Sequence, residues 1–348
     1  MNLDIDIVKA LDGFNLTVKL KVDNEVLGIL GASGCGKSMT LKCIAGIETP
    51  DKGHIILNNR VLFDSAKHIN LPPQKRRVGY LFQSYALFPN MTVAENIGFA
   101  LSGRPDKASI VQKYIEKLRL QGMEDKLPGQ ISGGQQQRTA LARMLAVETD
   151  IIMFDEPLSA LDSYLKWELE QELSDQFAEY NRPVLYVSHD RGEVFRLCRR
   201  IAVMEHGKIA LLDYKRELFE HPETVTGTLL TGCKNISAAR WQENGKLWAK
   251  DWGIGFTVPD SKAVGIAAVG VRAHFFEIAT AKFEDNVFSM VIEKIIEDVF
   301  DWIILLRPSE GAIKLLRWEI RKTGPMALKE GQSVHMTVKA HHILLLKS

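Results

Sequence analysis

Residues 31–38 read Gly-Ala-Ser-Gly-Cys-Gly-Lys-Ser, a glycine followed by four residues and then Gly-Lys-Ser. Glycines permit a tight turn whose backbone N–H groups point inward, where they and the positive N-terminus of a following helix attract phosphate oxygens. At this spacing Lys37 is placed to reach the β- and γ-phosphates of a nucleotide, and Ser38 to offer its hydroxyl to Mg²⁺. The stretch therefore predicts a phosphate-binding loop (P-loop).

The residues on both sides of the loop have the order that a P-loop requires. Residues 25–30 form a mainly apolar run of strand length, and residues 39–45 continue as a helix. The alternative is a chance glycine-rich turn between a strand and a helix, and the flanking pattern makes it the weaker interpretation. We therefore expect the strand, the loop and the helix to form one nucleotide-binding unit.

Length and composition limit the class of protein. The chain has 348 residues, which favours two domains, and its 44 Lys and Arg against 43 Asp and Glu give no charge that argues for nucleic acid or an anionic membrane. The four cysteines lack paired metal-ligand spacing, and one lies inside the P-loop, so a reducing cytoplasm is the simpler location. No stretch approaches the roughly 20 apolar residues needed to span a bilayer, and the N-terminus does not resemble a signal peptide. We expect a soluble protein that can still dock on a membrane protein.

The N-terminal region predicts a layer of strands. Residues 3–8 and 14–22 alternate apolar with polar residues on either side of an Asp-Gly turn, which predicts two strands of a half-exposed antiparallel layer. Residues 54–57 and 61–63 are separated by Asn-Asn and predict a hairpin. A further strand is expected at residues 78–82.

A helical region follows that strand. Residues 92–127 predict helix, with Thr92 as its N-cap. The apolar residues of 109–118 recur at helical spacing, and the charges opposite them fit a solvated surface better than a binding site. Residues 132–135, Ser-Gly-Gly-Gln, begin another helix, whose free N–H groups and positive end predict a second anion-binding helix terminus.

Two carboxylates end the next predicted strand. Asp155 and Glu156 follow an apolar run at residues 151–154, and Pro157 stops the strand directly after them. Open α/β sheets present catalytic and metal-binding groups at the carboxyl ends of such strands. We therefore expect chemistry at this strand end.

Helices and strands alternate along the rest of this half of the chain. A long amphipathic helix is expected at residues 163–180, a buried strand at 183–188 with His189 at its end, and a helix at 191–200 before a last strand at 201–204. This alternation predicts an α/β fold with a mostly parallel, doubly wound sheet.

The pattern changes from about residue 235. Short alternating or apolar runs predict a β-rich second domain of barrel type. The runs lie at 246–252, 264–271, 288–296, 302–306, 313–318 and 334–346. The tryptophans of this region fit core or inter-sheet contacts better than a platform for nucleobases. Residues 271–274, Val-Arg-Ala-His, resemble residues 338–341, Val-Lys-Ala-His, either as paired strands of a duplicated unit or by chance.

Separated motifs fall in one order along residues 1 to about 230. They are the P-loop at 31–38, Gln83, the segment 132–135, Asp155 with Glu156, Asp162, and His189. This order resembles the ATP-binding-cassette (ABC) family. A P-loop alone is also compatible with a GTPase, a kinase or a helicase. The segment 132–135 together with the later motifs excludes these classes of protein.

The resemblance implies that ATP and Mg²⁺ bind to this chain. The residues that it places on the nucleotide are Gly31, Ala32, Ser33, Gly34, Cys35, Gly36, Lys37, Ser38, Met39, Ser132, Gly133, Gly134 and Gln135. Ser38, Gln83 and Asp155 resemble the Mg²⁺ ligands, and Gln83 also senses the γ-phosphate. Glu156 resembles the general base for water, with a second metal ligand as its alternative role. His189 resembles the switch histidine that holds the γ-phosphate and Glu156 in register, with a core histidine as the alternative.

In this family the segment 132–135 closes on ATP bound to a second subunit. The resemblance therefore implies a homodimer with two sandwiched nucleotides, and Asp162 resembles the residue that crosses the dimer contact. Cys35 is expected to be chemically inert, with alkylation in the absence of ATP as the alternative, because its side chain would border the nucleotide. The family usually stacks adenine on an aromatic residue of the N-terminal strands, whereas Phe14 is the only aromatic candidate before Lys37, so weak stacking is expected.

The branch of the family is indicated by residues 71–83, with Leu-Phe-Pro at 87–89 and Thr-Val-Ala-Glu-Asn at 92–96. They resemble importer ATPases that serve binding-protein-dependent permeases. Residues 61–65 followed by 71–77 look closest to the molybdate-type subunits.

The resemblance also implies the domain organisation. An ABC ATP-binding domain is expected at residues 1–230, with a helical subdomain at about 84–138. The β-rich domain at 235–348 resembles the all-β, OB-like (TOBE/MOP-like) regulatory domains of molybdate, sulfate, polyamine and sugar importers.

The function that the resemblance implies is ATP hydrolysis that powers an importer of molybdate or a related oxyanion. The implied partners are a second copy, integral membrane permease subunits and an upstream substrate-binding protein, and no nucleic acid. The implied location is peripheral, on the cytoplasmic face of the membrane. The alternatives are import of sulfate, polyamine or sugar, a soluble ABC ATPase without a permease, and a β domain that senses anions in its own right.

Overall fold

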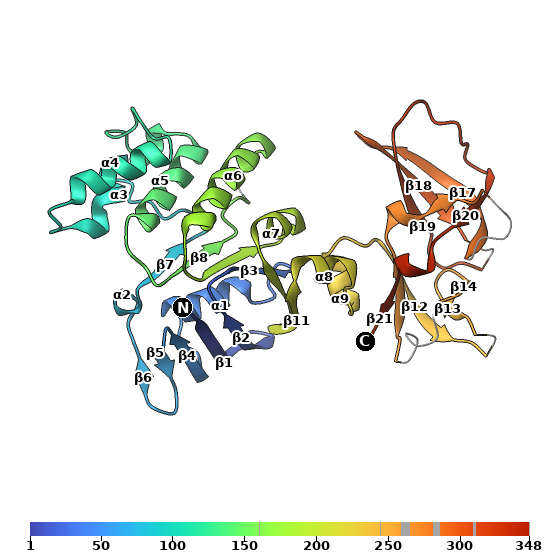
Figure 1. The fold of residues 1–348 in the computed structure, drawn as a ribbon, viewed down its shortest axis with the longest axis horizontal. Helices are drawn as coiled ribbons and strands as arrows, with labels where there is room; N and C mark the ends of the chain where they lie inside the picture. The colour runs from blue at the N-terminus through green and yellow to red at the C-terminus, as the bar shows by residue number, and fades with distance from the viewer. Residues whose placement is uncertain (160, 244, 259–264, 281–285, 309–310, 348) are drawn as a thin grey trace. The chain divides into compact units, whose positions relative to one another are not determined.

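The computed structural model describes residues 1–159, 161–243, 245–258, 265–280, 286–308 and 311–347. The chain divides into two compact units, Met1–Lys215 and Arg216–Ser348, whose elements are labelled in Figure 1. Among the described residues, no helix is both long enough and apolar enough to cross a membrane.

The first unit is built on a sheet of 11 strands in the order β6-β5-β4-β1-β2-β11-β10-β3-β9-β8-β7. Its parallel part, which carries the strand ends of interest, contains β10 (Arg200–Glu205), β3 (Val26–Gly31), β9 (Val184–Ser188), β8 (Ile151–Asp155) and β7 (Val78–Leu81). The other strands are β1 (Leu3–Leu11), β2 (Phe14–Val22), β4 (Lys52–Leu57), β5 (Arg60–Asp64), β6 (Ile69–Asn70) and β11 (Lys208–Tyr214). The predicted α/β class is confirmed, but the sheet is mixed rather than mostly parallel, because the N-terminal strands and the β10–β11 pair are antiparallel.

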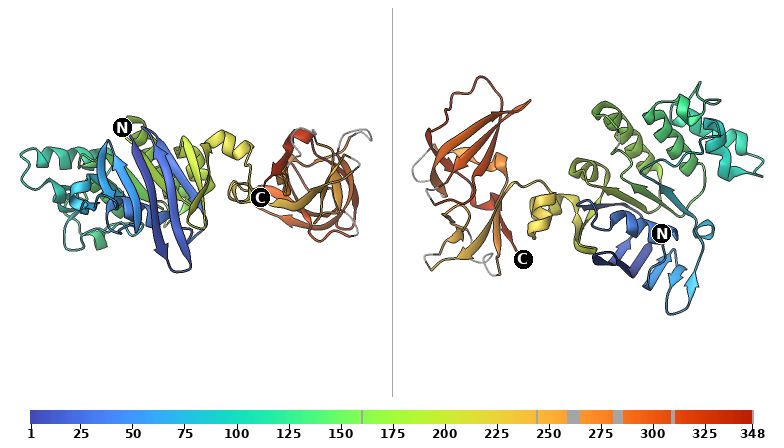
Figure 2. Two further views of the ribbon diagram at one scale, coloured as in Figure 1. Left: turned by 90° about the horizontal axis from the view of Figure 1, so that it is seen from below. Right: turned by 180° about the vertical axis from the view of Figure 1, so that it is seen from behind.

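The N-terminal strands form as the alternating pattern predicts. β1 and β2 pair antiparallel, from Leu3 opposite Val22 to Leu11 opposite Phe14, and the hairpin of β4 and β5 is also present. The left view of Figure 2 shows the long blue strands of this layer side by side. The apolar side chains of one face are fully buried against α1, and each such burial stabilises the fold by roughly 1.5 to 3 kcal/mol.

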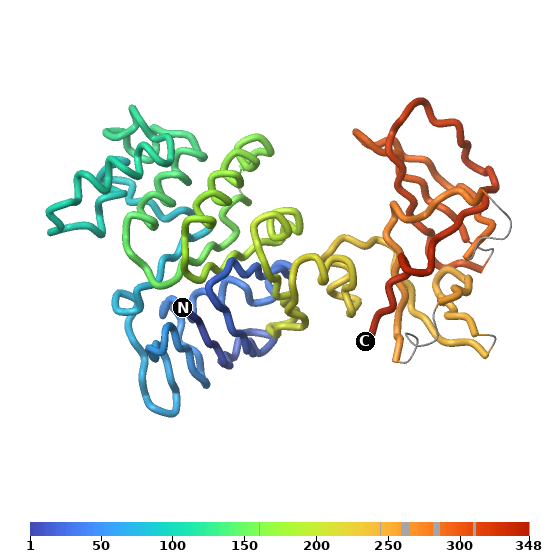
Figure 3. The backbone as a smooth tube through the Cα atoms, in the orientation of Figure 1, coloured from blue at the N-terminus to red at the C-terminus, as the bar shows by residue number. Residues whose placement is uncertain are grey.

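Helices flank this sheet and form a separate group beyond β7. The helices are α1 (Lys37–Ala45), α2 (Pro73–Arg76), α3 (Val93–Gly98), α4 (Lys107–Lys117), α5 (Gly133–Leu145), α6 (Ser163–Glu179) and α7 (Arg191–Leu197). Figures 1 and 3 show α3, α4 and α5 packed together as the helical group.

The expected continuous helix over residues 92–127 is wrong. Thr92 does cap α3, in a capping box with Glu95, but the helical path breaks between α3 and α4 and ends at Lys117. Gly103 has a φ of +81°, which a right-handed helix does not accommodate, and a proline follows two residues later.

The second unit is dominated by two five-stranded sheets, which confirms the predicted all-β domain. One sheet has the order β14-β13-β12-β15-β21, and the other β16-β20-β17-β18-β19. Their strands are β12 (Asn235–Trp241), β13 (Leu247–Ala249), β14 (Ile254–Phe256), β15 (Ala268–Val271), β16 (Glu277–Ile278), β17 (Val287–Glu297), β18 (Asp301–Arg307), β19 (Leu316–Arg321), β20 (Ser333–Thr337) and β21 (Ile343–Leu346). The core between them includes Trp252 and Trp318, as expected, whereas Trp241 is 40% exposed.

Two of the predicted runs differ from the strands that form. The run at 334–346 contains two strands, β20 and β21, separated by the 3₁₀ turn η5 (Ala340–His342). The run at 264–271 contains β15 in its second half, and its first residue, Val264, lies outside the described residues.

The similar segments at 271–274 and 338–341 are not paired with each other, so that expectation is wrong. β15 pairs with β12 and β21, whereas β20 pairs with β16 and β17. Each segment instead leads from a strand of one sheet into a 3₁₀ turn, η4 (Ala273–Phe275) or η5, and then into the other sheet. The rings of Phe275 and His342 stack at 3.8 Å, so the two turns lie against each other.

Two short helices, α8 (Lys215–Glu220) and α9 (Val225–Leu230), lead into the second unit. Arg272 of this unit donates hydrogen bonds to the carbonyl oxygens of Phe219 and Thr231. These contacts explain why the division falls after Lys215. The sequence limits of 1–230 and 235–348 stay a prediction.

Candidate active site

The P-loop joins the end of β3 to the start of α1. Gly34 and Gly36 have φ values of +79° and +110°, and a Cβ on Gly36 would lie 2.7 Å from Cδ1 of Leu16. Only glycine adopts such a backbone without strain. Because Gly36 is the N-cap and has no side chain, it leaves the first N–H groups of α1 available to an anion.

The Lys37 side chain is folded back onto its own loop. Its Nζ donates hydrogen bonds to the carbonyl oxygens of Gly31 at 2.8 Å and Ala32 at 3.0 Å. The same Nζ lies 3.7 Å from Oε1 of Glu156, and the lysine side chain is only 4% exposed. The ammonium group therefore links the P-loop to the carboxylate that follows β8.

Asp155, the last residue of β8, is held by two hydroxyl groups. Ser38 Oγ donates to its Oδ1 at 2.7 Å, and Tyr80 OH donates to its Oδ2 at 2.8 Å. A hydroxyl and a carboxylate in contact are the hard oxygen ligands that Mg²⁺ prefers, so these residues fit that ion. Burial, and then the charge of Asp155, raises the pKa of Tyr80, which keeps this hydroxyl protonated and able to donate.

Tyr80 is a functional candidate that the sequence analysis missed. It lies on β7 opposite Met153 of β8, and the parallel pairing of these strands places its hydroxyl beside Asp155. The sequence signal that could have found it is the alternation of side chains along β7, which places Tyr80 on the opposite face of the sheet from its neighbours Gly79 and Leu81.

Glu156 and His189 face each other at the ends of two adjacent strands. His189 Nδ1 lies 3.0 Å from Oε2 of Glu156. The backbone of Glu156 has a φ of +48°, and its N–H donates to the carbonyl oxygen of Val187 at 3.0 Å. A non-glycine residue in this conformation is uncommon and is found at functional sites. His189 has a 58% exposed side chain, so it is not a core histidine.

Three other expected site residues lie apart from this cluster. Gln83 follows β7 and is exposed, and the described part of the chain gives it no hydrogen bond to Ser38 or Asp155. Ser132 caps α5 in a capping box with Gln135, whose N–H donates to Ser132 Oγ at 3.3 Å.

The segment 132–135 belongs to the helical group, and within the described residues no hydrogen bond or ion pair joins it to the P-loop. Asp162 caps α6 by accepting from the N–H groups of Tyr164 and Leu165 at 3.0 Å. The structure therefore unites the P-loop, Asp155, Glu156 and His189 in one cluster and leaves these motifs outside it.

For Cys35 the structure favours the expected inert thiol over the alternative of a thiol open to alkylation. Its side chain is 8% exposed and packs into the core cluster of the first unit. Burial raises the pKa of the Cys35 thiol, which makes it less reactive. The ring of Phe14 lies at the start of β2 next to Gly207, where an added Cβ would come within 2.8 Å of Phe14 Cδ2.

A strand-end carboxylate held by the P-loop hydroxyl, with a second carboxylate beside it, is an arrangement by which proteins position a nucleotide and its metal ion for phosphoryl transfer. The first unit is thus a P-loop nucleotide-hydrolysing domain.

Comparison with known proteins gives the family. The family model described as ABC transporter matches residues 11–159. The chain is 32% identical over 353 residues to the molybdenum import ATP-binding protein ModC of Haemophilus ducreyi, covering 97% of this chain and 99% of that protein. It belongs to the ABC transporter family and is an ABC ATPase of the importer type.

Two further comparisons match mainly the first unit. The chain is 42% identical over 219 residues to the spermidine/putrescine import ATP-binding protein PotA of Ruegeria pomeroyi, which covers 62% of this chain and 57% of that protein. The solved structure of the ATP-binding cassette MJ0796, a dimer in a post-hydrolysis state bound to ADP and Pi, is 28% identical with a TM-score of 0.54. That match covers 62% of this chain and 99% of the solved chain.

Proposed function

We propose that this chain is the ATP-hydrolysing subunit of an importer whose cargo is molybdate or a related oxyanion. The observation that carries the proposal is the likeness to a molybdenum import protein over 97% of this chain, second unit included. The likeness to a polyamine import protein is higher in identity but covers only 62% of the chain. A similarity says more about the cargo when it includes the second unit as well as the ATPase unit.

In this proposal the P-loop binds the phosphates of ATP. The free N–H groups at the start of α1 surround them, and Lys37 exchanges its bonds with Gly31 and Ala32 for the β- and γ-phosphate oxygens. This exchange also moves the ammonium group away from Glu156, from which it lies 3.7 Å in this structure.

Ser38 and Asp155, which already touch each other, would hold Mg²⁺ together with Gln83, which lies two residues after β7. When bound, the ion neutralises charge on the β- and γ-phosphate oxygens. Tyr80 fixes the second oxygen of Asp155 and so keeps the first oxygen directed at Ser38.

Glu156 then acts as the general base. It takes a proton from the water that attacks the γ-phosphorus, while the bond from that phosphorus to the β-phosphate oxygen breaks and leaves ADP and phosphate. His189, 3.0 Å from Glu156 through Nδ1, orients the carboxylate and leaves its other ring nitrogen for the γ-phosphate.

A second copy of the chain completes each site. Ser132, Gly133, Gly134 and Gln135 form an anion-binding helix start that is not joined to the P-loop of its own chain in the described residues. We therefore propose a homodimer that closes on two ATP molecules, with Asp162 at the contact. Its partners are permease subunits in the membrane and an upstream substrate-binding protein, and it works peripherally on the cytoplasmic face.

The experiment that tests the catalytic proposal is Glu156→Gln. The variant should lose about 10²- to 10⁴-fold in ATP turnover, the usual contribution of a general base, and still bind ATP and dimerise. The matched control is Glu116→Gln on the exposed face of α4, which should hydrolyse ATP like the parent. Undiminished turnover by Glu156→Gln would refute the assignment.

The experiment that tests the cargo uses the chain with its permease in proteoliposomes. ATP turnover and uptake should rise with molybdate and its binding protein, and should stay at the basal rate with sulfate, spermidine or maltose. Stimulation by spermidine or maltose alone would overturn the oxyanion proposal, and stimulation by sulfate alone would exclude molybdate as the cargo. Failure to copurify with any integral membrane protein would favour the soluble alternative.

A further inference from the structure

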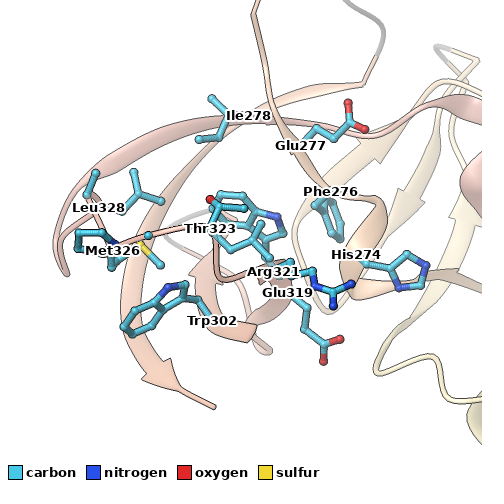
Figure 4. A pocket seen from close by; sticks show the side chains of 15 residues that line it. His274, Phe276, Glu277, Ile278, Trp302, Glu319, Arg321, Thr323, Met326 and Leu328 are labelled. Carbon is cyan, nitrogen blue, oxygen red and sulfur yellow. The ribbon is translucent and has the colours of Figure 1, made fainter. Parts of the chain in front are cut away.

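The second unit contains a cavity of about 720 Å³ that is remote in sequence from every ATPase motif. It is lined by residues of η4, β16, β18 and β19 and by the segment 323–328. Figure 4 shows Met326 and Leu328 on one side of it and His274 and Phe276 on the opposite side. Its size lies in the range of pockets that bind small organic molecules.

The walls of this cavity are mostly apolar and aromatic. Phe276 and Trp318 are 2% and 3% exposed, and Trp302, Met326 and Leu328 complete the lining. A tetrahedral oxyanion bound among these groups would lose its hydration without gaining matching donors, which is costly. The lining therefore favours an organic ligand with a large apolar body.

One buried donor in the wall has no acceptor. Trp318 Nε1 is buried and makes no hydrogen bond within the described part of the chain. An indole N–H can only donate, and an unsatisfied buried donor destabilises the fold by about 1 to 3 kcal/mol. Because this nitrogen is closed to solvent, the part of Trp318 that can face a ligand is its apolar ring.

The charged residues of the lining indicate that the ligand carries an acidic group. Glu319 is paired with Arg317 at 2.5 Å, and the neighbouring Lys322 with Glu297 at 2.8 Å. Arg321 lines the cavity too, but among the described residues no carboxylate lies within 4.0 Å of its guanidinium group. A free guanidinium group binds a carboxylate through two parallel hydrogen bonds.

We propose that this cavity binds a small organic acid, a monocarboxylate with an apolar body of aromatic size. Its carboxylate pairs with Arg321 and its ring lies among Trp302, Met326 and Leu328. Glu277, the remaining acid of the lining, lies across the cavity from Arg321 in Figure 4 and disfavours ligands with a second negative charge. This cavity shares no residue with the proposed ATP site. Binding there would make the second unit a sensor of an organic metabolite.

The test is calorimetric titration of the full chain, without nucleotide, with 3-phenylpropanoate as the probe. We expect saturable binding, at least about tenfold weaker binding of 2-phenylethylamine, which replaces the carboxylate by an ammonium group, and no heat with molybdate. Absence of binding by 3-phenylpropanoate at millimolar concentration would overturn the proposal. Equal binding of the amine, or displacement of the probe by molybdate, would overturn it as well.

Variants of the lining distinguish binding in this cavity from binding to apolar surface elsewhere on the chain. Arg321→Gln should weaken binding of 3-phenylpropanoate at least about tenfold. The matched control is Arg240→Gln, an exposed arginine on β12 in the other sheet, which should bind like the parent. Near-UV circular dichroism checks that each variant is folded, and equal affinity of folded Arg321→Gln and parent would refute the role of Arg321.

Discussion

Lys166 is a positioning residue outside all of the motifs that the sequence analysis used. It lies in the first turns of α6, and its Nζ is 2.5 Å from Oδ2 of Asp190 and 2.6 Å from Oε1 of Glu193. Asp190 directly follows His189, and the Glu193 carboxylate is 3% exposed. One cation on α6 therefore holds the segment that carries His189.

Replacing Lys166 by Met removes this cation and leaves much of the side-chain volume in place. Glu193 then keeps only two donors to its other oxygen, the hydroxyl groups of Tyr186 at 2.9 Å and Ser188 at 2.8 Å. Leaving a buried charge without its partner costs about 3 to 5 kcal/mol, and we predict a loss of this size in the free energy of unfolding. ATP turnover should also fall, with KM for ATP nearly unchanged, because His189 loses its fixed position.

The dependence on pH gives a second measurement. Burial lowers the pKa of Lys166, but its hydrogen bonds to Asp190 and Glu193 outweigh burial and leave that pKa raised. Burial raises the pKa of Asp190, but the hydrogen bond and charge of Lys166, with the backbone N–H groups of Glu193 and Gly192, together outweigh it and leave that pKa lowered. The parent therefore keeps this stabilisation from about pH 4 to about pH 10, losing it as the pH falls through the pKa of Asp190 or rises through that of Lys166.

In Lys166→Met the stability deficit should shrink as the pH falls below about 4, because the parent then loses the charge of Asp190 that Lys166 pairs with. Urea unfolding followed by far-UV circular dichroism measures the deficit at each pH. Lys166→Arg and the pair Lys166→Met with Glu193→Gln should both recover most of the lost stability. The control, Lys67→Met, breaks an exposed pair with Asp64 and should cost at most about 1 kcal/mol. The reasoning would be refuted if Lys166→Met were as stable as the parent. It would also be refuted if the stability losses of Lys166→Met and Glu193→Gln simply added in the double variant.

Three shorter predictions concern the ATP site. Tyr80→Phe removes the donor to Oδ2 of Asp155, so turnover should fall about tenfold with little change in KM for ATP, and steady-state kinetics with an unchanged kcat would contradict this. Gly36→Ala forces a φ of +110° on a residue with a Cβ and a 2.7 Å approach to Leu16, so the Kd for ATP should rise at least about fivefold, as calorimetry would show. Native Cys35 should resist iodoacetamide at pH 8 and react after unfolding in urea, and rapid labelling of the folded chain, read by mass spectrometry, would disprove its burial.

The parts of the site that are continuous in sequence were predictable. The P-loop needs only local glycine conformations and a strand and helix beside it, so residues 31–38 sufficed to place β3 and α1. Asp155 and His189 were predictable for a related reason, since each ends a buried strand and the carboxyl ends of parallel strands meet at one edge of the sheet.

The second unit was predictable as a class and less so in its detail. Strand propensity and alternation are enough to identify an all-β domain, but they do not mark where a chain leaves one sheet for the other. In the run at 334–346 polar residues occur both within β20, at His335 and Thr337, and across η5, at His341 and His342, so polarity alone does not separate β20 from β21. Likewise, the apolar Ile313 lies in a loop and is 77% exposed, although it belongs to the run at 313–318 that was expected to form a strand.

The residues that were missed share a physical cause. Tyr80 acts through a bond to the neighbouring strand, and Lys166 through bonds to the N-terminal turn of α7, so each role depends on register between elements rather than on a local pattern. A tyrosine on a strand and a lysine on a helix are ordinary residues there, and composition does not distinguish them from surface positions. What makes them informative is that each contacts a carboxylate next to a predicted catalytic group. Further positioning residues of this ATPase should therefore be found by their hydrogen bonds to such carboxylates, and not by further sequence motifs.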